Sequence, residues 1–266
     1  MMRRGSVRGF WLASWTLYAR EVTRFFRQPS RVVGALGTPL LFWVLIGSGV
    51  GDTFRPAGGP AVANYLAYFL PGAVVLTLLF TAIFSTISII EDRREGFMQA
   101  VLAAPVSRGS IVMGKLLGGA TLATIQGFLL LLVGPAVGLS PPLGAWLAAL
   151  AVMFLVGFSL TGFGFCFAWR TESVQGFHAV MNLLMMPMWI LSGALFPAAG
   201  AAAWVRVVMG LNPLSYGLDL LRAVLHAGTV QPPGGMALAL GVSILFAAVM
   251  FVMSWSLVCK PTTRPA

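Results

Sequence analysis

The sequence predicts an all-α membrane protein with six transmembrane helices. Of its 266 residues, 58% are hydrophobic and only 9% are charged, whereas soluble domains carry about 25% charged residues. Apolar segments of about 20 residues, the length needed to cross a bilayer as a helix, recur along the chain. The alternating ten-residue segments of a transmembrane β-barrel are absent from the sequence. We therefore expect one membrane domain spanning residues 1–266.

The six predicted spans are separated by short polar segments that are rich in arginine. We expect the spans at residues 32–50, 65–90, 116–137, 143–168, 177–196 and 236–258. With the N-terminus inside, the cytosolic segments hold fourteen of the 17 basic residues: Arg3, Arg4, Arg8, Arg20, Arg24, Arg27, Arg31, Arg93, Arg94, Arg108, Lys115, Arg170, Lys260 and Arg264. The outer segments hold Arg55, Arg206 and Arg222. The positive-inside rule then predicts that both termini are cytosolic, and it accounts for the net charge of +10 without nucleic acid.

Residues 10–28 precede the first span and are amphipathic at helical spacing. One face carries Trp11, Trp15, Tyr18, Val22 and Phe25, and the opposite face carries Arg20, Arg24 and Arg27. Aromatic residues opposite arginines are typical of a helix that lies in the membrane interface. Pro29 is expected to end this helix. A soluble helix that packs on a partner protein is the alternative.

Residues 91–115 form the predicted cytosolic loop between the second and third spans. It begins with five consecutive charges, Glu91, Asp92, Arg93, Arg94 and Glu95. After Gly96, an apolar helical face of Phe97, Met98, Val101 and Leu102 continues until Pro105, and Ser107 and Arg108 lead back to the membrane. A short helix of this kind fits a groove on another protein. The alternative is a solvated loop that only follows the positive-inside rule.

The outer segment at residues 197–235 contains two apolar pieces that are too short to cross a bilayer. Asn212 and Pro213 separate them. We predict a re-entrant or interfacial helical hairpin.

The chain offers no convincing energy source or catalytic centre of its own. Its seven acidic residues lie in loops or at span ends, so we expect no buried proton relay. The stretch "GSIVMGKL" at 109–116 resembles a phosphate-binding loop, but Leu116 replaces the Ser or Thr that would hold Mg²⁺. Gly114 and Gly118 are instead expected to allow close helix packing.

An intramembrane serine protease at Ser192 would need His178 or His226 as its base. His178 lies 14 residues away, about 21 Å along the same predicted helix, so this reading is disfavoured. Several large apolar residues suggest either a pathway lining or ordinary packing: Phe158, Phe163, Met181, Met185 and Met188. The methionine thioethers could also suggest a Cu(I) site. No Cys or His stands beside them in the sequence, and methionine is a common packing residue, so no metal is expected.

Two patches of the sequence carry a resemblance to a known family. The first is "EDRREGFMQAVLAAPVSRGSIVMGK", and the second, "LSGALFPAAGAAAWVRVVMGLNPLSYGLDLLR", contains Ser192, Gly193, Phe196, Pro197, Asn212, Pro213 and Arg222. Together they resemble the membrane subunit of type-2 ABC transporters, a family of bacterial exporters of drugs, lipids and polysaccharides. One departure is residues 199–203, where the family often has a proline.

The resemblance implies a permease without enzymatic activity in a prokaryotic plasma (inner) membrane. Two copies would pair amid membrane lipids, and two cytosolic ABC ATPases would bind the loop that begins at Glu91 and the N-terminal helix. This chain would hold no cofactor, and ATP and Mg²⁺ would bind the partner ATPase. The exported cargo would be hydrophobic, lipidic or glycan-like. The alternative is a secondary carrier or channel that does not depend on ATP.

Overall fold

The computed structural model describes residues 7–50, 65–227 and 230–260, and all regular secondary structure in these ranges is helical. The predicted all-α class is therefore confirmed. Six helices are long and apolar enough to span a membrane: α2 (Pro29–Val50), α3 (Tyr65–Arg94), α5 (Arg108–Leu131), α6 (Leu143–Ala168), α7 with its continuation η3 (Val174–Trp189 and Ile190–Ala194) and α10 (Gly235–Cys259). Arg3, Arg4, Arg55 and Arg264 lie outside the described residues.

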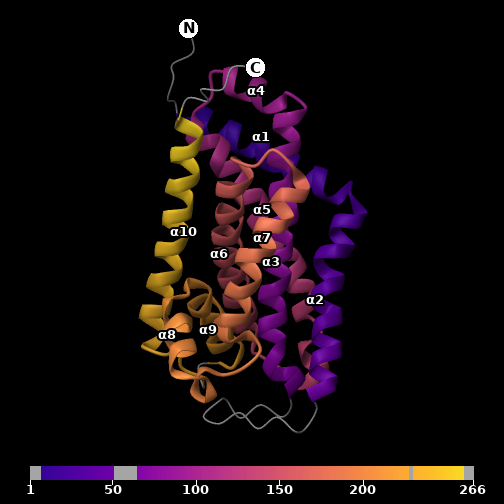
Figure 1. Ribbon diagram of the computed structural model, residues 1–266, viewed down its shortest axis with the longest axis vertical. Helices are drawn as coiled ribbons and strands as arrows, with labels where there is room; N and C mark the ends of the chain where they lie inside the picture. Colours follow the sequence, from indigo (N-terminus) through magenta and orange to yellow (C-terminus); the bar gives the residue numbers. More distant parts are fainter. Residues whose placement is uncertain (1–6, 51–64, 228–229, 261–266) are drawn as a thin grey trace.

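The shorter elements gather at the two ends of the helical bundle. These are α1 (Val7–Phe26), α4 (Phe97–Ala103), η2 (Gly134–Val137), η4 (Ala198–Gly200), α8 (Ala203–Leu211) and α9 (Pro213–Leu225). Helices α1 and α4 lie at one end of the bundle, and α8 and α9 lie at the opposite end (Figure 1). We refer to these as the α4 end and the α9 end.

Helix α3 forms the centre of the bundle. It packs against α2, α5 and α6, and its side chains from Tyr65 to Ile90 are almost all buried. By contrast, α2 and α10 bury only one stripe each and expose large apolar side chains such as Leu45 and Leu245. Helices that are apolar on all sides and yet exposed are typical of membrane spans.

The predicted boundaries of the N-terminal helix and of the third span were wrong. The N-terminal helix ends at Phe26, and Pro29 begins α2 instead of ending α1, because proline is readily accepted at the first position of a helix. The third span was expected at 116–137, but α5 begins at Arg108 and ends at Leu131. Its charged start is helical because Lys115 is paired inside the protein, and Pro135 cannot continue a regular helix beyond Leu131.

The fifth span also differs from the expected range of 177–196. Helix α7 begins at Val174 and loses its regular geometry after Trp189, where a π-helical segment leads to Gly193 at φ +87°. This left-handed conformation is accessible mainly to glycine. The break turns the chain toward α8 and α9, which lie beside it at the α9 end (Figure 1).

Candidate functional site

The predicted cytosolic loop is shorter and more helical than the sequence suggested. Helix α3 continues through Arg94, so four of the five consecutive charges are helical. Gly96 has φ +78° and separates α3 from α4. No atom lies within 4 Å of a Cβ built there, so the backbone conformation, and not crowding, requires glycine. The extended Ala104 then ends α4 before Pro105, and the Ser107 hydroxyl caps α5 by accepting from the Ser110 amide at 3.1 Å.

The apolar face of α4 packs on the protein itself. Met98 is fully buried, and Phe97, Val101 and Leu102 pack against the same core. The Arg20 guanidinium lies 3.7 Å from the centre of the Phe97 ring. The expectation that these apolar side chains fill a groove on another protein therefore needs correction. The exposed surface of α4 and of the turn after it is formed by Gln99, Ala100, Ala103, Ala104 and Pro105.

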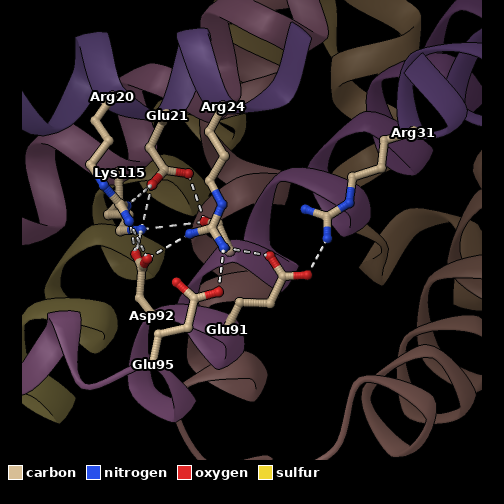
Figure 2. Close-up of polar contacts among 9 residues, drawn as sticks. Arg20, Glu21, Arg24, Arg31, Glu91, Asp92, Glu95 and Lys115 are labelled. Carbon is tan, nitrogen blue, oxygen red and sulfur yellow. Dashed lines mark hydrogen bonds and ion pairs between the residues drawn. The ribbon is translucent and has the colours of Figure 1, made fainter. Parts of the chain in front are cut away.

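A network of charged side chains that we call the ion cluster lies beside α4 and contacts it where Arg20 covers the Phe97 ring. It comprises Arg20, Glu21, Arg24, Arg31, Ser88, Glu91, Asp92, Glu95 and Lys115. These residues come from α1, α2, α3, α5 and the turn before α4. Figure 2 shows their side chains converging below α1. Four basic residues face four acidic residues, so the formal charge of the ion cluster is balanced.

Asp92 is the centre of the ion cluster and is fully buried. Its carboxylate accepts from Arg20 Nη2 at 2.7 Å, from Arg24 Nη1 at 2.6 Å and from Lys115 Nζ. Three cationic donors satisfy this buried carboxylate, as a charge removed from water requires. Asp92 lies at the end of a span, as expected from the sequence, but its side chain is buried within the protein.

Lys115 and Glu21 form the second buried pair of the ion cluster. Lys115 Nζ donates to a carboxylate oxygen of Glu21, and the other oxygen accepts from the Ser88 hydroxyl at 2.6 Å. Lys115 thus contacts α1 and α3 instead of a phosphate, which contradicts a phosphate-binding role for the stretch 109–116. A lysine within an apolar helix requires an acidic partner nearby, and this was the signal that could have found Glu21.

The outer part of the ion cluster fixes α2 and the turn before α4. Arg24 Nη2 donates to Glu91 at 2.8 Å, and Arg31 donates to the other oxygen of Glu91. Burial acts to lower the pKa of Arg24, but the carboxylates of Asp92, Glu91 and Glu95 raise it above its ordinary value. Arg24 therefore stays charged across the physiological pH range.

Helix α1 packs on α5 through two glycines, as the sequence predicted. A Cβ on Gly114 would lie 2.6 Å from the Ser14 carbonyl oxygen, and one on Gly118 would lie 2.8 Å from Glu21 Cβ. The predicted arginine face is divided, because Arg20 and Arg24 point into the ion cluster while Arg27 is exposed. The aromatic face is divided too: Trp11 and Trp15 are exposed, Tyr18 is half-buried and Phe25 is buried.

Two further charged residues of the predicted loop connect α3 to the turn between α6 and α7. Arg93 donates to the carbonyl oxygens of Trp169 and Thr171, and Arg94 Nε donates to the carbonyl oxygen of Glu172 at 3.0 Å. The end of α3 is therefore joined to α1, α2, α5 and the α6–α7 turn. Arg108, by comparison, is half-buried at the first position of α5.

At the α9 end, the break after α7 is joined to the hairpin formed by α8 and α9. The Asn212 side chain caps α9 by accepting from the Leu214 amide at 3.0 Å, and it donates to the Met188 carbonyl at 2.6 Å. Pro213 is the first residue of α9. The buried Arg222 donates through Nη2 to the Gly193 carbonyl at 2.8 Å. Phe196 and Pro197 lie half-buried in the chain that leads from the break to α8.

The serine protease reading gains no support from the geometry. The Ser192 hydroxyl donates to the carbonyl of Trp189 in its own helix at 2.6 Å. Ser192 and His226 border two different cavities, and no histidine lines the cavity at Ser192 among the described residues. Among the described residues, the Ser192 hydroxyl therefore has no hydrogen bond to the base that a nucleophile requires.

The residues suggested as a pathway lining are mainly packing residues within one chain. Met181 and Met185 are fully buried, and Met188 is half-buried against the same core. Phe158 stacks on Phe251 with ring centres 6.4 Å apart, and Phe163 contacts Phe167 at 5.1 Å. The packing interpretation accounts for these five residues in this conformation.

Comparison with known proteins identifies relatives over most of the chain. Residues 13–226 match the family described as ABC-2 type transporter. Nodulation protein J of Rhizobium leguminosarum bv. viciae is 26% identical over 257 residues, which cover 96% of this chain and 95% of that protein. Cyanophora paradoxa ycf38, which carries a transport-permease name, is 29% identical over 213 residues, covering 78% and 72%. The "Probable multidrug ABC transporter permease YbhR" of Escherichia coli K12 is 24% identical over 162 residues, covering 60% and 44%.

Proposed function

Because the chain belongs to the ABC-2 type transporter family, we propose that two copies of it form an export pathway driven by separate ABC ATPase subunits. The chain itself is a multi-pass membrane subunit of an ABC transporter. ATP and Mg²⁺ would bind the ATPase, and this chain would convert the movement of the ATPase into a rearrangement of its spans.

The observation that carries this proposal is the connection between α4 and the spans through the ion cluster. Asp92 lies at the end of α3, five residues before α4 begins, and contacts α1 and α5. A force on α4 would therefore reach α3, the central helix of the bundle, and with it α1 and α5. A flexible loop at this position would absorb the same force.

The proposed docking surface for the ATPase is the exposed side of α4. Gln99, Ala100, Ala103 and Ala104 form a small, mostly uncharged surface that suits a close contact with a groove. Helix α1 lies at the same end of the bundle as α4 (Figure 1), and Arg27, directly after α1, is exposed. The apolar residues Phe97 and Met98 would support α4 from behind.

The proposed orientation has the α4 end in the cytosol. The basic residues of α1, of the end of α3 and of the α6–α7 turn favour this side, and ATP is available there. Helices α8 and α9 would then lie at the outer membrane surface as a re-entrant or interfacial hairpin. The membrane would be the plasma membrane of a prokaryote.

The proposed cargo is a hydrophobic molecule, a lipid or a lipid-linked glycan. Apolar side chains dominate the exposed surfaces of the spans, which favours a cargo that travels beside or within the lipid. The multidrug name of the E. coli relative agrees with a hydrophobic cargo.

The proposal is tested by reconstituting the chain with an ABC ATPase that copurifies with it from its native membrane. We expect transport into inverted vesicles to require that ATPase and ATP. Ala100→Arg on the exposed side of α4 should abolish copurification of the ATPase and its stimulation by the chain. The matched control is Ala202→Arg, also an exposed alanine, directly before α8, which should leave both unchanged.

Two results would contradict this proposal. One is transport by the purified chain alone under an ion gradient, which would favour the secondary carrier or channel. The other is full ATPase stimulation by Ala100→Arg, which would remove α4 from the docking surface.

A further inference from the structure

A polar cavity lies at the α9 end, between the broken end of α7 and the α8–α9 hairpin. Its volume is about 330 Å³, at the lower end of the range for small-molecule sites. The polar and charged residues that border it include Ser192, Arg206, Ser215, Tyr216, Asp219 and Arg222. This concentration of polar groups is unusual in a chain that is only 9% charged. The cavity shares no residue with the ion cluster.

Arg222 is held in the cavity wall with one donor unused. Its side chain is buried, Nη2 donates to the Gly193 carbonyl at 2.8 Å, and the guanidinium lies 4.5 Å from the centre of the Tyr68 ring. Its Nε group is buried and has no hydrogen-bond partner. Because an arginine nitrogen can only donate, this group requires an acceptor that the protein does not supply.

Ser215 provides a second unused polar group on the same cavity. Its residue is 7% exposed, and its hydroxyl is buried without a hydrogen-bond partner. Most serine hydroxyls elsewhere in the described spans donate to a carbonyl one turn back, as Ser159 and Ser243 do. A buried hydroxyl without a partner is rare in native structures. Ser215 and Arg222 therefore point independently to a missing ligand.

The charges around the cavity favour an anion. Arg206 and Arg222 carry two positive charges, and Asp219 is the one acidic residue among those that border the cavity in the described part of the chain. Asp219 is only loosely paired, with its carboxylate 3.9 Å from Arg222 Nη1. Burial raises the pKa of Asp219 to about 6, against the opposing effect of Arg222. The net charge of the cavity is thus positive with Asp219 either ionised or neutral.

We propose that this cavity binds a phosphate group, either of a soluble phosphate ester or of a lipid headgroup, through Arg222 Nε and the Ser215 hydroxyl. Phosphate oxygens accept hydrogen bonds from both groups, and arginine is well suited to phosphate. The volume exceeds that of phosphate alone and leaves space for a small substituent. The phosphate site lies at the α9 end and does not depend on ATPase coupling at the α4 end. Either proposal can therefore fail without the other.

The test measures the unfolding midpoint of the purified full-length chain in a non-ionic detergent, without ATPase. The soluble probes are glycerol 3-phosphate and glycerol, and the lipid probes are phosphatidate and diacylglycerol. We expect a saturable rise in the midpoint with one or both phosphate-bearing probes and none with their phosphate-free partners. A response to glycerol 3-phosphate identifies a site that accepts a soluble ester, and a response to phosphatidate alone identifies a headgroup site.

Ser215→Ala is the decisive variant because its hydroxyl makes no bond that the fold depends on. It should keep the midpoint of the ligand-free protein and weaken the apparent affinity for the phosphate probe at least fivefold. Asp219→Asn should strengthen that affinity by removing a negative charge. The matched control is Ser256→Ala in α10, an exposed serine that does not border the cavity, and it should bind like the parent protein.

Arg222→Lys should weaken binding more than tenfold, because lysine keeps the charge but lacks the Nε donor. If that variant does not fold, Ser215→Ala and Asp219→Asn still decide the result. Equal affinities of the parent protein and Ser215→Ala would overturn the proposal. Equal responses to glycerol and glycerol 3-phosphate, or no saturable response to any phosphate-bearing probe, would overturn it as well.

Discussion

Lys115 of α5 donates to Asp92 of α3, and both side chains are almost completely removed from solvent, with 2% and 0% of their surface exposed. The same ammonium group donates to Glu21 of α1. One lysine therefore joins a central span, a second span and the helix that crosses them at the α4 end. A buried charge that joins three elements in this way is costly to leave without its partners.

Lys115→Met is expected to destabilise the protein by about 3 to 5 kcal/mol, because it leaves the Glu21 carboxylate buried without its main cation. The measurement is the unfolding midpoint of the purified chain in detergent. Adding Glu21→Gln should restore part of the loss, since the unpaired charge is then removed. Lys260→Met is the matched control, because Lys260 is exposed just after α10. A similar loss from both single lysine variants would show that the buried pairing of Lys115 contributes nothing specific.

Close packing of α1 on α5 gives a second prediction. Gly114→Ala should destabilise the protein by about 1 to 3 kcal/mol, because the new Cβ would lie 2.6 Å from the backbone oxygen of Ser14 and must push α1 away. Gly241→Ala in α10 is the control, since no atom lies within 4 Å of its Cβ position. Alanine is a better helix former than glycine, so the control should be neutral or slightly stabilising. The unfolding midpoint should therefore fall in Gly114→Ala and stay the same or rise slightly in Gly241→Ala.

Hydropathy and residue spacing predicted the membrane helices well where the ends of a span carry clear signals. The fourth span was expected at 143–168, and α6 occupies these residues. Pro141 and Pro142 limit it on one side, and Arg170 marks the other. The prediction failed at α5, where Lys115 suggested a start in water although the lysine is paired within the bundle. Pairing between distant segments is not visible in a local hydropathy pattern.

At the α4 end, local residue spacing likewise predicted the elements of the candidate site but not the contacts between them. The spacing of Phe97, Met98, Val101 and Leu102 correctly identified a short helix with one apolar face. It did not reveal what that face contacts, and in the structure the contact is intramolecular. Likewise, the periodicity of Arg20 and Arg24 predicted a charged face on α1, but their acidic partners lie about 70 positions later in the chain. The contacts of the α4 face and of the α1 arginines depend on segments that are distant in the sequence, which a local pattern does not show.

Asp219 gives a prediction about pH. Its pKa is raised by burial to about 6 in the folded protein, from an ordinary value of 3.8. The folded state therefore retains a proton that the unfolded state has already released. It follows that the free energy of unfolding decreases as the pH rises from about 4 to about 6, by about 2 kcal/mol from this group.

Asp219→Asn should remove that part of the pH dependence. The measurement compares the unfolding midpoints of the parent protein and the variant between pH 4 and pH 7.5. The difference should be small near pH 4 and should grow in favour of the variant through about pH 6, and it should level off above about pH 7. A difference that does not depend on pH, or that grows as the pH falls, would show that Asp219 is not the buried group that we describe.

Asn212 connects the α8–α9 hairpin to the break after α7, and substitutions can separate its two contacts. Asn212→Ala removes both the cap on the Leu214 amide and the donation to the Met188 carbonyl. Asn212→Ser keeps a capping oxygen, because serine is a good residue at this position, but lacks the amide donor. We expect alanine to cost more than serine by about 1 kcal/mol, the usual value of a cap.

The loss that remains in Asn212→Ser reports the contact with Met188, which should contribute about 1 kcal/mol. The unfolding midpoints of both variants measure the two contributions, and Ser107→Ala at the start of α5 gives the value of a cap without a second contact. If Asn212→Ser is as stable as the parent protein, the bond from Asn212 to the Met188 carbonyl contributes nothing measurable to holding the hairpin. If Asn212→Ala loses more than Ser107→Ala and Asn212→Ser is also less stable than the parent protein, the asparagine helps to fix the hairpin on the broken end of α7 through its bond to Met188.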